Sequence, residues 1–200
     1  MNVPRSISSF LNPLFVSFYF FIVTLNLSPH VMTPLPEKAK WMIYGLIIIT
    51  TYVIPGLFIS LYGNMIQRVF NYGNNERKMS HLFIAAIFYF LTYYLLRQIN
   101  LSPIYTLFVL GSTTLLGVSI IITLFWNISI YMLAMGAFSG ALLGISMIFN
   151  INLLFPIFMV ILLSGLLGYS RLSLGEHRPL EVYGGYLVGL SGMMLHYFFF

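Results

Sequence analysis

The sequence predicts an all-α membrane protein, a polytopic bundle of six to seven membrane-spanning helices. Of its 200 residues, 60% are hydrophobic and only 6% are charged, whereas about 25% of a soluble globular domain is charged. The stretch from Gln98 to Ser170 has no charged residue. That stretch is long enough for three crossings, because one crossing needs about 20 apolar residues. This composition leaves no room for a separate soluble domain, so we expect a single integral membrane domain over residues 1–200.

Apolar blocks separated by charged residues, proline or asparagine mark the predicted helices. The first block is interrupted by Asn12 and Pro13, and no small-residue cleavage site follows it, so we expect a retained helix rather than a removed signal peptide. Boundaries read from such patterns shift by a few residues. The predicted helices cover Phe10 to Leu27, Trp41 to Tyr62, His81 to Arg97, Ile104 to Trp126, Ile130 to Phe149, Leu153 to Tyr169 and Val182 to Phe200.

Several classes of site are not expected from the composition. Cysteine is absent, which excludes disulfides and thiolate chemistry. The four histidines are scattered and lack metal-ligand spacing, so we predict no metal site and no cofactor. The net charge of +5 is typical of the positive loops of membrane proteins. Because no basic arm is present, nucleic acid is not an expected partner.

Polar residues concentrate in three segments between the predicted helices: Gln67 to Ser80, Asn127 to Tyr131, and Ser170 to Glu181. Two predicted helices separate each segment from the next. The three segments are therefore expected on the same side of the membrane, where their side chains could form one site.

The last of these segments combines basic, imidazole and carboxylate groups. His177 and Glu181 are four residues apart, which places them on one face if they are helical. Glu181 would then bind one ring nitrogen and leave the other for nucleophilic attack. Arg171 and Arg178 have guanidinium groups suited to phosphate oxygens. The alternative is an ordinary interfacial loop, whose arginines reach lipid headgroups and whose Glu176 and Glu181 neutralise them.

The start of the helix after this segment is open. Ser173 with Glu176 resembles a capping box, which would start the helix early. Pro179 prefers the first turn of a helix that starts later. A later start would make the His177–Glu181 pair looser than ideal helical spacing implies.

The order Ser170-Arg171, five residues, His177, three residues and Glu181 resembles the third motif of the type 2 phosphatidic acid phosphatase superfamily. That motif ends in Asp, where this chain has Glu181. The resemblance implies a helical membrane enzyme that hydrolyses lipid phosphates or diphosphates without metal, through a phosphohistidine intermediate. It implies His177 as nucleophile, Glu181 as its orienting acid and Arg171 as a phosphate ligand.

The family's other two motifs are degenerate in this chain. At the distance of the second motif, Pro-Ser-Gly-His, Ser129 matches the serine and Tyr131 stands in place of the acid histidine. A rival placement at Ser139-Gly140 lies deeper in a predicted helix. In the first motif, Arg77 matches the arginine, but no proline follows and Phe70 replaces the lysine. Arg68 and Lys78 remain nearby as substitutes in the first motif, and His81 as a replacement for the acid histidine. The resemblance covers roughly residues 68–189, within a phosphatase-like core of about 68–200.

The sequence therefore predicts a lipid phosphate or prenyl diphosphate phosphatase at the membrane interface. The predicted catalytic residues are His177, Glu181 and Tyr131, and the predicted phosphate ligands are Arg171, Arg77, Ser129 and Arg178. Tyrosine is a poorer general acid than histidine at pH 7, which costs a diphosphate substrate less than a monoester. The alternative is a catalytically silent relative that binds phospholipid or a protein partner.

The expected partners are membrane lipids and a phosphorylated lipid substrate, in the bacterial inner (cytoplasmic) membrane by resemblance. Glycine recurs at every fourth position in Gly136, Gly140 and Gly144, and again in Gly185 and Gly189. Such small faces allow helices to approach closely. We expect them to pack within the bundle, and a homodimer interface is the alternative.

Overall fold

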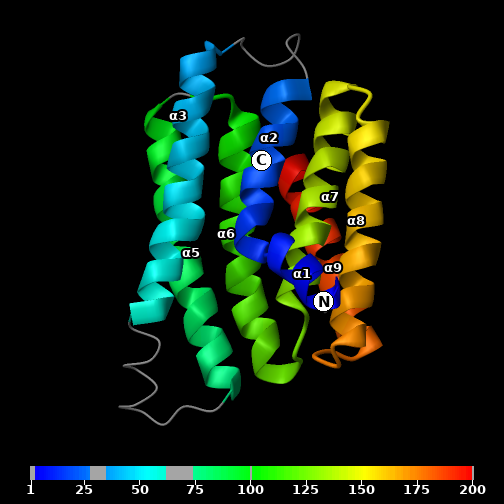
Figure 1. Ribbon diagram of the computed structural model, residues 1–200. Helices are drawn as coiled ribbons and strands as arrows, with labels where there is room; N and C mark the ends of the chain where they lie inside the picture. Colours follow the sequence, from blue (N-terminus) through cyan, green and yellow to red (C-terminus); the bar gives the residue numbers. More distant parts are fainter. Residues whose placement is uncertain (1–2, 28–34, 62–73, 100, 200) are drawn as a thin grey trace. The chain divides into compact units, whose positions relative to one another are not determined.

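The computed structural model describes residues 3–27, 35–61, 74–99 and 101–199, without the side chains of residues 3, 27 and 74–77. All regular structure in these ranges is helical, so the chain is an all-α polytopic membrane protein, as predicted (Figure 1). The elements are α1 (Val3–Phe10), α2 (Pro13–Leu27), α3 (Glu37–Ile48), the π-helical turn η1 (Ile49–Val53), α5 (Asn74–Gln98), α6 (Pro103–Phe125), α7 (Ile130–Phe149), α8 (Leu154–Ser173) and α9 (Pro179–Phe199).

Five of the described helices are long and apolar enough to cross a membrane, and α1 with α2 makes a sixth if the bent pair is one span. The five are Glu37–Leu61, Lys78–Gln98, Pro103–Phe125, Ile130–Phe149 and Leu154–Ser173. The predicted last span, Val182 to Phe200, is helical as α9 up to Phe199 but is not among them. Its glycines, tyrosines and His196 dilute its apolar character. The described helices therefore give five clear spans or, with the bent pair, the six at the lower end of the predicted range.

The chain divides into two compact units. The first unit is Met1–Pro34 with Asn127–Phe200, and the second is Leu35–Trp126. In the second unit, the helix from Glu37 to Leu61 widens into the π turn η1. Pro55 follows this turn and has no N–H to donate to a carbonyl one turn earlier, which accounts for the local widening. Helices α5 and α6 pack against each other in the same unit.

In the first unit, α7 is the central helix, with α8 beside it and α9 behind it (Figure 1). A Cβ on Gly136 or Gly140 would overlap the backbone of α9, and one on Gly189 would overlap the carbonyl oxygen of Leu133 on α7. A Cβ on Gly144 would lie 2.9 Å from the Cβ of Tyr197. The predicted packing of these glycine faces within the bundle is confirmed, and the two faces are used between α7 and α9.

The first predicted helix, Phe10 to Leu27, corresponds to α2, and a further helix, α1, precedes it at a bend of 60°. The break lies at Leu11 and Asn12, since Pro13 begins α2 and the side chain of Asn12 accepts a hydrogen bond from the N–H of Leu14, at 3.1 Å. Asn12 therefore caps α2 at its start. Helix α1 then packs on the end of α8, where Ser8 and Ser170 are joined through their hydroxyls at 2.8 Å.

Candidate functional site

The turn between α8 and α9 carries the predicted chemistry. Helix α8 ends at Ser173, and Gly175 adopts a left-handed backbone with φ +67°, which reverses the chain after the helix. Helix α9 begins at Pro179, so the later of the two predicted starts is correct and the early capping box does not form. His177 therefore lies before the helix rather than inside it.

The His177–Glu181 pair forms nevertheless. Nδ1 of His177 lies 2.8 Å from a carboxylate oxygen of Glu181, and the same oxygen accepts the backbone N–H of Arg178 at 3.2 Å. Glu181 is the third residue of α9, a position from which a carboxylate reaches back to the start of its helix. The expectation of a looser pair was wrong for this reason. Both side chains are mostly buried, with 9% of His177 and 14% of Glu181 exposed.

These contacts set the charge state of Glu181. Burial alone raises the pKa of this carboxyl group, but the hydrogen bonds from His177 and Arg178 and the nearby positive charges outweigh burial and hold the pKa below its usual value. Glu181 is therefore ionised at neutral pH. An ionised carboxylate favours the tautomer of His177 that donates from Nδ1.

Arg171 is buried at the end of α8, with 6% of its surface exposed. Its guanidinium lies over the ring of Tyr131, 4.1 Å from the ring centroid. It is also paired with the carboxylate of Glu176, which is half exposed. Its Nε is buried and has no hydrogen-bond partner within the part of the chain that the structure describes. A buried N–H donor without a partner is costly and suggests a missing acceptor.

Ser129 lies at the start of α7, two residues before Tyr131, whose ring contacts Arg171. It is the N-cap residue of α7, but its hydroxyl makes no capping hydrogen bond and is buried without a partner in the described residues. Its backbone N–H donates to the carbonyl oxygen of Glu181 at 3.1 Å. The N-terminus of a helix favours anions. Ser129 therefore adds a second unpartnered polar group, two residues before the tyrosine that Arg171 contacts.

These contacts join the predicted residues into one group, the rim cluster: Ser129, Tyr131, Arg171, Glu176, His177 and Glu181. Arg171 contacts the ring of Tyr131. The backbone of Glu181 is hydrogen-bonded to that of Ser129, which precedes Tyr131 by two residues. The segments Asn127 to Tyr131 and Ser170 to Glu181 therefore meet, as the count of helices between them predicted. The arrangement combines an oriented imidazole, a buried guanidinium and a helix N-terminus, which are the types of group used to attack and to bind an oxyanion.

Other predicted residues lie elsewhere. The side chain of Arg77 and all of Arg68 lie outside the described residues, and Arg77 and Lys78 belong to the second unit. The side chain of Arg178 is exposed. Ser139, the rival for the second motif, is buried in α7, where it donates to Met135 and accepts from Tyr186 at 3.0 Å. Its hydroxyl is used in packing α7 against α9.

Two features of the site were missed from the sequence. Glu176 was considered only as a capping or neutralising residue, although its opposite charge close to Arg171 in the sequence was a usable signal. The N-terminus of α7 was also missed, because its role depends on where Ser129 lies relative to Arg171.

Comparison of the chain with protein-family models, curated proteins and solved structures finds no match to any of them.

Proposed function

We propose that the protein is a lipid phosphate or prenyl diphosphate phosphatase whose phosphate site is the rim cluster. One observation carries the proposal: a buried arginine with an unpartnered Nε lies at the same helix N-terminus that contacts the His177–Glu181 pair. A phosphate group offers the acceptors that Arg171 and Ser129 lack. The resemblance of residues 170–181 to a phosphatase motif supports the same chemistry.

The reaction would proceed in two steps. With Nδ1 bound to Glu181, Nε2 of His177 attacks phosphorus, the bond from phosphorus to the leaving oxygen breaks, and a phosphohistidine forms. Water then attacks that phosphorus, and inorganic phosphate leaves as the histidine is restored. Arg171 and the N-terminus of α7 stabilise the negative charge on the transferred group.

A diphosphate fits this site better than a monoester. The family's acid histidine is replaced by Tyr131, whose ring lies against the guanidinium of Arg171. An alkoxide leaving group needs a proton, whereas a phosphate leaving group departs without one. We therefore propose that diphosphates are turned over faster than monoesters at the membrane interface. By the same resemblance, we propose that this membrane is the bacterial inner membrane.

The test is phosphate release from prenyl diphosphates and lipid phosphates by the purified full chain in detergent. His177→Ala should abolish release. His196→Ala is the matched control, because His196 is a buried histidine in the last turn of α9, at the other end of the helix that His177 precedes. The control should retain most activity. A wild-type protein that is as inert as His177→Ala over the whole substrate panel would reject the enzyme and favour a silent lipid-binding protein.

A further inference from the structure

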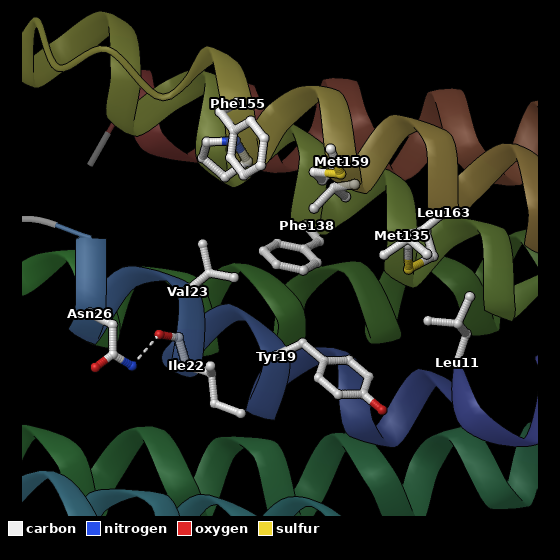
Figure 2. A pocket seen from close by; sticks show the side chains of 12 residues that line it. Leu11, Tyr19, Ile22, Val23, Asn26, Met135, Phe138, Phe155, Met159 and Leu163 are labelled. Carbon is white, nitrogen blue, oxygen red and sulfur yellow. Dashed lines mark hydrogen bonds between the residues drawn. The ribbon is translucent and has the colours of Figure 1, made fainter.

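A cavity of about 430 Å³ lies within the first unit, between α2, α7 and α8 (Figure 2). Phe155, Met159 and Leu163 of α8 face Phe138 of α7 and Val23 of α2 across it. Its walls are apolar apart from Tyr19 and Asn26. The hydroxyl of Tyr19 donates to the carbonyl oxygen of Phe10 at the end of α1. The side-chain amide of Asn26 donates to the carbonyl oxygen of Ile22, one turn earlier in α2. The cavity therefore suits a hydrocarbon occupant.

The size of the cavity limits that occupant. An α-helix with side chains is about 10 Å across, which is too thick for this space, whereas small ligand sites have volumes of about 300–1,000 Å³. Helices α7 and α8 are both apolar enough to cross a membrane, so the surrounding medium is lipid chains. A single flexible hydrocarbon chain has both the thickness and the chemistry that the cavity requires.

Two segments run from the lining of the cavity to the rim cluster. On α8, Leu163 lies eight residues and Phe155 sixteen residues before Arg171, or about 12 and 24 Å at 1.5 Å per residue. Helix α1 leads the same way: Ser8 is bonded to Ser170, next to Arg171, and Leu11 lines the near end of the cavity. One leaflet provides about 15 Å of hydrocarbon depth. An ordinary chain from the rim cluster would reach only the near end, and a longer chain would be needed to fill it.

We propose that this cavity takes the distal part of one long hydrocarbon chain belonging to the phosphorylated lipid held at Arg171, and so selects for chain length. The inference rests on the proposed function for the position of the phosphate. Moving a chain from bilayer into an apolar cavity brings no hydrophobic gain. Selection therefore comes from packing, with the phosphate holding the chain in place.

The test uses the full chain in nanodiscs and a long single-chain alkyl phosphate with a photoreactive diazirine at its chain end. Labelled peptides are mapped by mass spectrometry. We expect label on residues 155–163 and on α2, reduced several-fold in Met159→Trp. Phe158→Trp is the matched control, since Phe158 is exposed and does not line the cavity. If Met159→Trp does not fold, Leu163→Phe fills the same space.

A second probe, the alcohol with the same chain, identifies the source of the occupant. We expect it to label the cavity several-fold less than the phosphate. Equal labelling would mean that the cavity holds bulk lipid chains, and label spread evenly over outer surfaces would mean that it holds none. Either result overturns the inference. Turnover of a short-chain phosphate, measured beside it, tests the proposed enzyme separately, because that substrate does not reach the cavity.

Discussion

Glu176→Gln should strengthen phosphate binding, because the carboxylate of Glu176 occupies the guanidinium that the substrate would need. Arg171 is 6% exposed, but Glu176 is half exposed, so the pair resembles a partly solvated ion pair worth up to about 1 kcal/mol. Removing that competition should raise phosphate affinity by up to about fivefold. The assay is the dissociation constant of inorganic phosphate by calorimetry in detergent, together with KM for a diphosphate substrate.

Glu37→Gln is the matched control for this experiment. Glu37 is exposed and paired with Lys40 at 2.9 Å in the second unit, so the change removes the same charge. We expect it to leave phosphate affinity unchanged. Weaker phosphate binding in Glu176→Gln would refute the reasoning, since it would mean that Glu176 holds Arg171 in position rather than competing for it.

Three further changes test the cluster and its support. Tyr131→Phe should keep activity within about fivefold, because the contact with Arg171 uses the ring face; a loss of a hundredfold or more would assign the hydroxyl as general acid. The lowered pKa of Glu181 means that its charge stabilises the fold above the ordinary carboxyl pKa of about 4.3 and loses this effect as pH falls. The melting temperature of wild type should therefore exceed that of Glu181→Gln above about pH 5, and this margin should shrink as the pH falls further. Gly189→Ala should destabilise by about 1–3 kcal/mol, because its Cβ meets the backbone of α7, whereas Gly165→Ala, with open space at its Cβ, should not lower the melting temperature.

The helical fold was predictable because its signal is composition over whole spans. Apolar blocks located α3 and α6 to α9 to within a few residues, and α5 apart from its first seven residues. The count of helices between polar segments placed Tyr131 and Arg171 on the same side of the membrane. The break at Asn12 was visible as a cap followed by proline, but the helix before it was not predicted. That helix, α1, is held by the contact between Ser8 and Ser170, residues far apart in the sequence.

The site was predictable where it depends on local spacing and unpredictable where it depends on three-dimensional packing. His177 and Glu181 are four residues apart, so their pairing follows from a single turn of chain. The ion pair of Arg171 with Glu176 requires the reversal at Gly175. The cavity beside α8 requires α2, from a distant part of the sequence, to pack beside α7 and α8. Apolar residues carry no pattern that distinguishes a cavity wall from a lipid-facing surface.

The glycine face of α9 links fold stability to the site. A Cβ on Gly185 would lie 2.6 Å from the carbonyl oxygen of Ser129, one turn after the point where Glu181 accepts the N–H of Ser129. Without side chains at Gly185 and Gly189, the backbones of α7 and α9 approach closely enough for this hydrogen bond to form. The same approach brings the N-terminus of α7 and its unpartnered Ser129 hydroxyl to the start of α9, where His177 is held. Close helix packing usually serves stability in membrane proteins. Here it also fixes the distance between the N-terminus of α7 and the candidate nucleophile that precedes α9.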